Sequence, residues 1–207
     1  MNNLGGAFWQ SPIMGAIVSE VAGAADFPCP SPGHSHHGRM DVDVQAGEII
    51  GMLGLLPHPE GGYFRETFRS SDMVTLADGR ERSAGTSIYY LLPQGTFSAL
   101  HKVAADEIWH FYLGAPLELL TITPAGDLEV HLLGCQLDAG QRPQYTVPSG
   151  VWQAARALPS SGGFTLVGCT VSPGFDFADF EMPGRAALGA LFPQHQAIID
   201  SFTRYEE

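Results

Sequence analysis

The chain has few cysteines and few basic residues, and each shortage excludes a class of protein. Its three cysteines, Cys29, Cys135 and Cys169, are odd in number and widely spaced, with no Cys-x-x-Cys pair. That pattern indicates neither a zinc ribbon nor a disulfide framework, so we expect reduced thiols. Lys+Arg is 10 and Asp+Glu is 22, which gives a formal net charge of -12. A surface this acidic repels phosphate backbones, so we expect no nucleic-acid binding.

Long apolar runs are also missing. The sequence contains no stretch of about 18 apolar residues without a charge, so we expect no membrane-spanning segment. No Lys or Arg precedes Arg39, although a secretory signal peptide needs a positively charged start. We therefore predict a cytoplasmic protein.

Glycine and proline, in contrast, are plentiful. The 25 Gly and 15 Pro residues favour many short strands over long helices. Residues 1–46 are rich in Gly, Ala, Ser and Pro and show no sustained apolar period, so we predict a flexible N-terminal extension there. Residues 47–207 are then one folded domain.

Within that domain, alternating apolar residues separated by Gly, Pro and Asp turns predict nine strands. The expected strands are Tyr63–Arg69, Ser87–Leu92, Ser98–Lys102, Ile108–Leu113, Leu117–Thr123, Leu128–Leu133, Gln144–Val147, Trp152–Ala157 and Phe164–Val171. Helical spacing predicts a short helix over Glu48–Leu55 and two more over Arg185–Arg204. We therefore expect an all-β sandwich or barrel with short helices at both ends.

The stretch Gly95–Gly114 carries the clearest chemical pattern, with His101 six residues before Glu107. Residues two apart in a strand share a face, so a His-x-His pair supplies two metal ligands, and a glutamate on the next strand supplies a third. Val103 stands where the second histidine would be. His110 does not replace it, because strand alternation turns His110 outward if Glu107 points inward.

This spacing resembles the first signature of the cupin superfamily, Gly-x5-His-x-His-x3,4-Glu-x6-Gly. The second signature, Gly-x5-Pro-x-Gly-x2-His-x3-Asn, is similar to a segment that keeps Pro148 and Gly150 but has Gln153 at the histidine position. The resemblance implies a barrel with a pocket. His101, Glu107 and Gln153 would be the ligands of a divalent Fe, Mn, Ni or Zn ion, but we favour a pocket without a cofactor.

Longer stretches are similar to one cupin family. His58–Ser70, Thr86–Leu92, Asp106–Tyr112 and Val171–Phe175 together resemble the family called DUF985 or cupin_5. The resemblance runs from about residue 47 to 204. It implies a double-stranded β-helix, or jelly roll, assembled as a homodimer. The reaction of the family is not established, so the resemblance implies no particular activity.

Two segments are also similar to the RmlC-like dTDP-sugar 3,5-epimerases, which are cupins that work without a metal. Glu60–Phe68 is similar to their Arg-Gly-x-Phe-x-Glu segment, and Gly95–His101 to the segment with their catalytic histidine. This resemblance implies His101 as the base and Glu66 as a ligand contact. Gly61 replaces the arginine of that segment, which puts phosphate or nucleotide binding in doubt. The candidate acids are Tyr90 and Tyr145.

The remaining site residues are candidates for ligand contacts. Strand alternation places Phe64, Glu66 and Phe68 on one face and Tyr63, Arg65 and Thr67 on the other. We predict ligand contacts from Phe64, Glu66, Arg65 and Gln153, although Arg65 would equally pair with a carboxylate at a dimer contact. Trp109 and Phe111 would form apolar pocket walls or pack in the core.

Three functions fit this pattern. The favoured one is a small-molecule-binding cupin that acts as a metal-independent epimerase or isomerase on a sugar-like carbonyl compound. His101 would be the base, and Glu107 beside it would favour the imidazolium form. The alternatives are a metal-dependent oxygenase or isomerase with an incomplete ligand set, and a non-enzymatic ligand-binding or sensor module.

Overall fold

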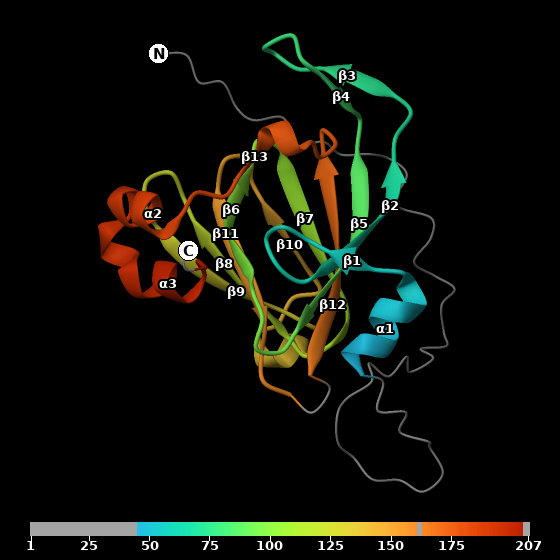
Figure 1. Ribbon diagram of the computed structural model, residues 1–207, viewed down its shortest axis with the longest axis vertical. Coiled ribbons are helices and arrows are strands. Elements are labelled where there is room, and N and C mark those ends of the chain that lie inside the picture. The colour runs from blue at the N-terminus through green and yellow to red at the C-terminus, as the bar shows by residue number, and fades with distance from the viewer. Residues whose placement is uncertain (1–44, 161–162, 205–207) are drawn as a thin grey trace, which may run out of the picture. The chain divides into compact units, whose positions relative to one another are not determined.

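The computed structural model describes residues 45–160 and 163–204. The predicted N-terminal extension, residues 1–46, therefore lies almost entirely outside the described residues. The domain consists of two antiparallel sheets that pack face to face, with short helices on their outer faces (Figure 1). The prediction of an all-β jelly roll is confirmed.

The larger sheet has six strands. In spatial order they are β1 (Leu56–Pro57), β2 (Tyr63–Arg69), β5 (Thr86–Pro93), β12 (Phe164–Ser172), β7 (Asp106–Gly114) and β10 (Gln144–Val147). The five strands of the second sheet are β13 (Phe180–Glu181), β6 (Ser98–Val103), β11 (Trp152–Ala157), β8 (Leu117–Ile122) and β9 (Leu128–Leu133). A separate hairpin pairs β3 (Met73–Thr75) with β4 (Glu81–Ser83). All nine expected strands are present, and the four that the sequence pattern missed are only two or three residues long.

The core lies between the two sheets. Its buried side chains alternate along their strands, as Tyr90 and Leu92 do on β5 and Leu117 and Leu119 do on β8. Trp109 of β7 is fully buried among them. Removal of these side chains from water is the main favourable term in folding.

The short helices that the apolar spacing predicts are present, and they cover the outer faces of the sheets. α1 (Ala46–Leu53) packs on the larger sheet through Ile49, which lies among Leu91 and Leu166. α2 (Arg185–Leu191) and α3 (Gln196–Ser201) cover the second sheet through Leu188 and Ile199. Short 3-10 turns occupy Leu137–Ala139, Phe177–Asp179 and Pro193–His195.

Two expectations from composition have different outcomes. No helix in the part of the chain that the structure describes has the length and apolarity that a membrane crossing requires. Cys169 is a free, buried thiol, whereas Cys135 is disulfide-bonded, so the expectation of reduced thiols is wrong at Cys135. Distance along the chain says little about proximity in the fold, which is why sequence spacing missed it. Cys29 lies outside the described residues.

A tight turn at Gly61 and Gly62 precedes β2. Gly61 has a φ of +118°, and a Cβ there would lie 2.1 Å from the carbonyl oxygen of Phe97. Gly62 has a φ of +66°, and its Cβ would lie 2.7 Å from the carbonyl oxygen of Leu91. Only glycine fits this close approach. The turn therefore holds the preceding residues, including Glu60, against β6.

We expect Gly61→Ala to destabilise the domain more than Gly79→Ala does. Gly79 also has a positive φ, +86°, but nothing lies within 4 Å of its Cβ position. Gly79→Ala should cost only the backbone penalty of about 1–2 kcal/mol. Gly61→Ala should add an overpacking cost of about 1–3 kcal/mol. Urea unfolding of both variants measures the difference, and equal losses would contradict this account of the turn.

Candidate functional site

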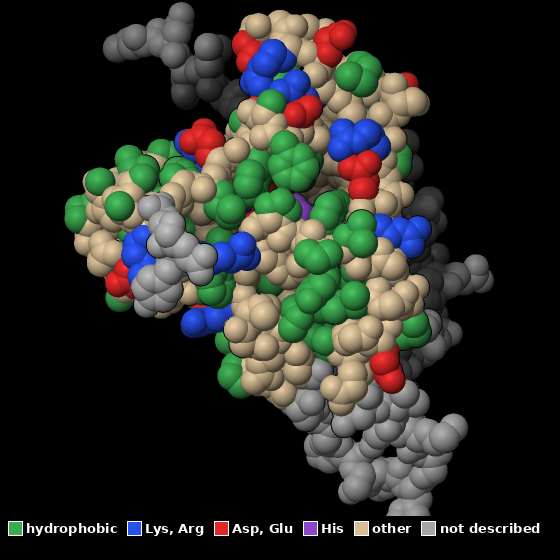
Figure 2. All heavy atoms as spheres, in the orientation of Figure 1, with side chains coloured by type: hydrophobic (Ala, Val, Ile, Leu, Met, Phe, Trp, Pro, Cys, Tyr) green, Lys and Arg blue, Asp and Glu red, His purple; other side chains and the backbone are tan. Residues whose placement is uncertain are grey.

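A cavity of about 310 Å³ opens beside β2, β5, β6, β7 and β12, a size at the lower end for small-molecule sites. Aromatic, aliphatic and titratable side chains mix in its wall. The lining residues are His58, Glu60, Phe64, Glu66, Arg69, Thr86, Ile88, His101, Val103, Glu107, Cys169, Val171, Phe175, Asp176 and Phe177. In Figure 2 a histidine side chain is visible inside a hollow rimmed by hydrophobic side chains.

His101 lies deep in this cavity with one ring nitrogen already used. Strand β6 turns its side chain inward, where it is 2% exposed. Its Nδ1 lies 2.7 Å from the carbonyl oxygen of Ala99, which can only accept, so Nδ1 carries the hydrogen. The Nε2 atom lies 3.4 Å from Oε2 of Glu60. In the neutral ring, Nε2 therefore carries the lone pair.

Glu60 is the carboxylate that contacts His101, whereas the sequence analysis expected Glu107 in that role. The Ser98 hydroxyl donates to Oε1 of Glu60 at 3.0 Å. On the other side, Nδ1 of His58 lies 3.5 Å from Oε2 of Glu60. Burial lowers the pKa of His58, which keeps that ring neutral. Glu60 therefore connects two imidazoles at the floor of the cavity.

The sequence analysis missed both His58 and Glu60 as site residues. They precede the first long strand, in a segment that reads as a turn. The signal that would have found them is two titratable residues next to a glycine pair, because glycines allow a close approach of backbone that draws their neighbours inward.

Glu107 is the second carboxyl group in the cavity. It is 7% exposed, and burial raises its pKa, an effect that His101 partly opposes. The side-chain amide of Gln153 donates from Nε2 to Oε2 of Glu107 at 2.5 Å. Burial also raises the pKa of Cys169 well above its usual value, so this neighbour stays a thiol. Glu107 therefore takes up a proton at a higher pH than an exposed glutamate does.

Trp109 fixes the direction of the Gln153 amide. The indole Nε1–H of Trp109 donates to Oε1 of Gln153 at 2.9 Å. An indole N–H can only donate, so Oε1 must face Trp109 and the NH₂ group must face Glu107. Trp109 and Gln153 therefore lie behind the cavity wall and orient Glu107. Trp109 packs in the core, one of the two places that the sequence left open for it, and Gln153 does not line the cavity as a ligand contact.

Strand β2 contributes different residues from those that alternation predicts. A bulge between Glu66 and Phe68 shifts the register against β5. Phe64 and Glu66 line the cavity as expected, but beyond the bulge Arg69 lines it too, and Phe68 is 54% exposed. An extra residue in one strand reverses the faces that follow. The bulge is the reason that sequence reasoning missed Arg69.

Several other predicted residues lie away from the cavity. Arg65 is on the outer face of β2 and donates to the carbonyl oxygen of Leu53 at 2.9 Å, so its predicted ligand contact is corrected. Phe111 packs in the core between the sheets instead of lining the cavity. His110 contacts the hydroxyl of Thr170 at 3.2 Å, outside the cavity lining.

Neither candidate tyrosine lines the cavity. The hydroxyl of Tyr90 donates to the carbonyl oxygen of Gly61 at 2.8 Å, and burial raises the pKa of Tyr90 well above its usual value. Tyr145 stacks on His131, with ring centroids 3.7 Å apart. Both predictions of a catalytic acid are therefore corrected, since one hydroxyl is engaged in the turn and the other ring packs elsewhere.

The model of the family Cupin_5, described as the cupin superfamily (DUF985), matches residues 47–183. The chain belongs to this family. The resemblance that the four sequence stretches carry is thereby confirmed. The match covers the strands of both sheets, and it ends before α2.

This cupin is similar to proteins from three different organisms. It is 31% identical to the uncharacterized protein YML079W of Saccharomyces cerevisiae, over 80% of this chain and 87% of that protein. A hypothetical protein from Leishmania major is 36% identical, with a TM-score of 0.75, over 78% of this chain and all (100%) of that one. Protein SO0799 from Shewanella oneidensis is 40% identical, with a TM-score of 0.73, over 79% and 99%. None of these names states an activity.

The donor set of this cupin does not fit a mononuclear metal ion. Such a site needs three or four donors that converge on one point. Val103 lines the cavity where the first signature has its second histidine. Both ends of the Gln153 amide are engaged, with Trp109 and with Glu107. Across residues 45–160 and 163–204, no group of three or more His, Cys, Asp or Glu side chains is arranged to hold a metal.

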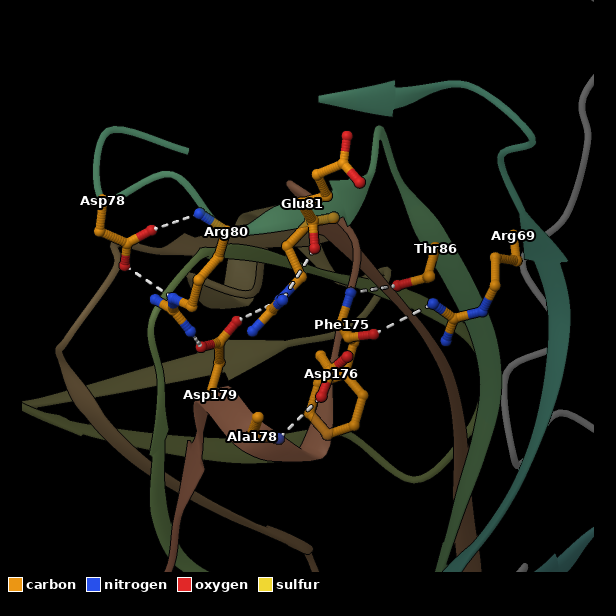
Figure 3. A network of polar contacts seen from close by, with 10 residues as sticks. Arg69, Asp78, Arg80, Glu81, Thr86, Phe175, Asp176, Ala178 and Asp179 are labelled. Carbon is orange, nitrogen blue, oxygen red and sulfur yellow. Dashed lines mark hydrogen bonds and ion pairs between the residues drawn. The ribbon is translucent and has the colours of Figure 1, made fainter. Parts of the chain in front are cut away.

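A segment after β12, residues 173–179, crosses the mouth of the cavity, and we call it the strap. Its Phe175 and Phe177 line the cavity. Figure 3 shows how the strap is tied: Arg69 donates to the carbonyl oxygen of Phe175 at 3.2 Å, and Thr86 accepts from its N–H at 3.0 Å. Backbone and side chains thus hold the aromatic rings over the ligand space.

The β3–β4 hairpin ties the far end of the strap. Arg80 and Arg82 both bind the carboxylate of Asp179, and the Arg82 Nε lies 2.7 Å from Oδ2. Figure 3 shows the contact of Arg80 with Asp179. The hydrogen bond from Arg82 lowers the pKa of Asp179. The pair is therefore fully present above the ordinary value of 3.8, and it is lost as the pH falls through the lowered pKa of the folded state.

We expect Asp179→Asn to loosen the strap. Without the carboxylate, Arg80 and Arg82 lose their shared partner, so amide hydrogen exchange of Phe175–Ala178 should rise while exchange in β5 and β12 stays unchanged. Asp78→Asn is the matched control, because it removes a carboxylate partner of Arg80 and leaves both arginine contacts of Asp179 in place. Equal exchange in the two variants would contradict the assigned role of Asp179.

We also expect Glu107→Gln to change the pH dependence of stability. A raised folded-state pKa means that the stability from protonated Glu107 is present below the ordinary value of 4.5 and is lost as the pH rises through the raised value. The glutamine variant lacks this loss, so its free energy of unfolding should gain on wild type as the pH rises. Urea unfolding across that pH range measures this gain, and exposed Glu81→Gln controls for one removed charge. Parallel curves for wild type and Glu107→Gln would refute the assignment.

Proposed function

We propose that this cupin isomerises a small sugar-like carbonyl compound by moving a proton between neighbouring carbons, without a metal. One observation carries the proposal: His101, with its Nε2 lone pair available, and two buried carboxyl groups line the same cavity. Proton abstraction beside a carbonyl needs a base for the C–H proton and an acid for the carbonyl oxygen.

His101 serves as the base. Its hydrogen bond to Ala99 holds the ring and leaves Nε2 to accept the proton. When the ring becomes an imidazolium, the carboxylate of Glu60, 3.4 Å from Nε2, stabilises the new charge. His101 is thus the base, and Glu60 is the group that stabilises the charged form of His101.

Glu107 serves as the acid. Burial raises the pKa of Glu107, so this carboxyl group keeps its proton to a higher pH than an exposed glutamate, and it can give that proton to a carbonyl oxygen. Transfer of that proton while His101 removes the carbon-bound proton leaves a neutral enediol. His101 then gives the proton that it removed to the neighbouring carbon. The hydroxyl group on the carbon that first lost its proton gives a proton back to Glu107. The isomerisation is then complete, and both residues are restored.

The placement of proton carriers favours isomerisation over epimerisation. An epimerase of the two-sided kind needs a second carrier on the opposite face of the substrate, the role that a tyrosine fills in the resembling enzymes. No tyrosine is among the cavity-lining residues in the described part of the chain. A one-base exchange between neighbouring carbons needs only His101 and Glu107.

Deuterium exchange tests this proposal. Wild-type protein in D₂O with free aldoses and ketoses, such as glucose, mannose and fructose, should place deuterium on the carbon next to the carbonyl, as followed by NMR. His101→Gln and Glu60→Gln should lower the exchange rate by about a hundredfold or more. His110→Gln, on the outer face, is the control and should exchange like wild type. Exchange that survives His101→Gln would overturn the mechanism, and a sugar bound without exchange would favour a binding protein.

A further inference from the structure

The cavity contains many more acidic groups than basic ones. Arg69 is the only arginine or lysine among the lining residues that the structure describes, whereas four carboxyl groups line the same space. The two imidazoles both flank Glu60, so they already face a carboxylate. Whether an anionic ligand binds therefore depends on whether the guanidinium group of Arg69 is available to it.

Arg69 is occupied by Glu66. Its Nε donates to Oε1 of Glu66 at 3.0 Å, and its Nη2 donates to Oε2 at 2.7 Å. This is the two-pronged geometry in which a guanidinium binds a carboxylate or phosphate. The third nitrogen, Nη1, donates to the carbonyl oxygen of Phe175 (Figure 3). Each nitrogen of the guanidinium thus already has a partner.

The β2 bulge creates this pairing. Glu66 lies opposite Ile88 and Arg69 opposite Thr86, so three steps along β2 (66 to 69) match two steps along β5 (88 to 86). In a regular strand, residues three apart point to opposite faces. The bulge turns both side chains to the cavity face, where the carboxylate of Glu66 occupies the position that an anionic ligand would take.

We propose that Glu66 determines specificity by occupying Arg69, so that the cavity rejects phosphorylated and carboxylated ligands and takes uncharged sugar-like carbonyl compounds. This proposal rests on the proposed function for the kind of compound that reacts. The side chains of Arg69 and Glu66 are 46% and 42% exposed, so a ligand from solvent can reach their contact. To bind Arg69 in the same two-pronged way, an entering phosphate must displace Glu66, and it then meets the repulsion of Glu66 and of Asp176 at the mouth. A free sugar meets neither barrier, and its hydroxyl groups can donate to these carboxylates.

A gain of phosphate binding in Glu66→Gln tests this proposal. Titration calorimetry with inorganic phosphate and with glucose 6-phosphate should show weak or no binding to wild type and a dissociation constant at least about tenfold lower in Glu66→Gln. The double variant Glu66→Gln/Arg69→Gln should lose the gain. Glu118→Gln is the control for a freed arginine, because it releases Arg156 from its ion pair and neither residue lines this cavity.

Three outcomes would overturn the proposal: phosphate binding to wild type as tight as to Glu66→Gln, a gain no larger than in Glu118→Gln, or a gain that persists without Arg69. Thermal unfolding of each variant checks that it is folded, and Glu66→Ala repeats the test with a different replacement. Phosphate binding is measured without turnover. A failure here therefore leaves the deuterium-exchange result standing, and a failure of exchange leaves this result standing.

Discussion

The residues at the floor of the cavity are arranged around one buried carboxylate, that of Glu60, which needs partners. A charge removed from water is costly unless hydrogen bonds and opposite charges surround it. The Ser98 hydroxyl donates to one oxygen of Glu60, and the other oxygen lies beside ring nitrogens of His58 and His101, each of which becomes an opposite charge when it takes up a proton. These partners come from β6 and from the turn before β2, so the turn must lie close against β6. The geometry of two glycines is thus a precondition of the site.

The sheet pattern was predictable from sequence, because alternation is a local property. The nine expected strands occupy their positions, and His101 and Glu107 both face the cavity. Local alternation fails where a strand adds a residue, and the bulge in β2 exchanged the expected places of Phe68 and Arg69. No pattern of apolar residues marks that bulge, since it depends on how β2 pairs with β5.

The contacts of the site were less predictable, because they join distant segments. Gln153 was a candidate ligand contact by its place in a motif, but its amide lies between Trp109 and Glu107. Glu60 was invisible as a partner of His101 because the two lie 41 positions apart (101 − 60) in segments of different character. Family resemblance supplied the barrel and the two cavity residues of its first motif, and only the three-dimensional arrangement supplied their partners.

The strap has a consequence for the order in which the domain assembles. Arg69 and Phe175, which tie it, are 106 positions apart in the chain. The strap follows β12, which is an inner strand of the larger sheet, paired with β5 on one side and with β7 on the other. During synthesis the strap therefore emerges only after β12 and every other strand that lines the cavity. The cavity is therefore among the last parts of the domain to be completed. A nascent chain that ends before residue 173 lacks the strap that covers the mouth of the cavity.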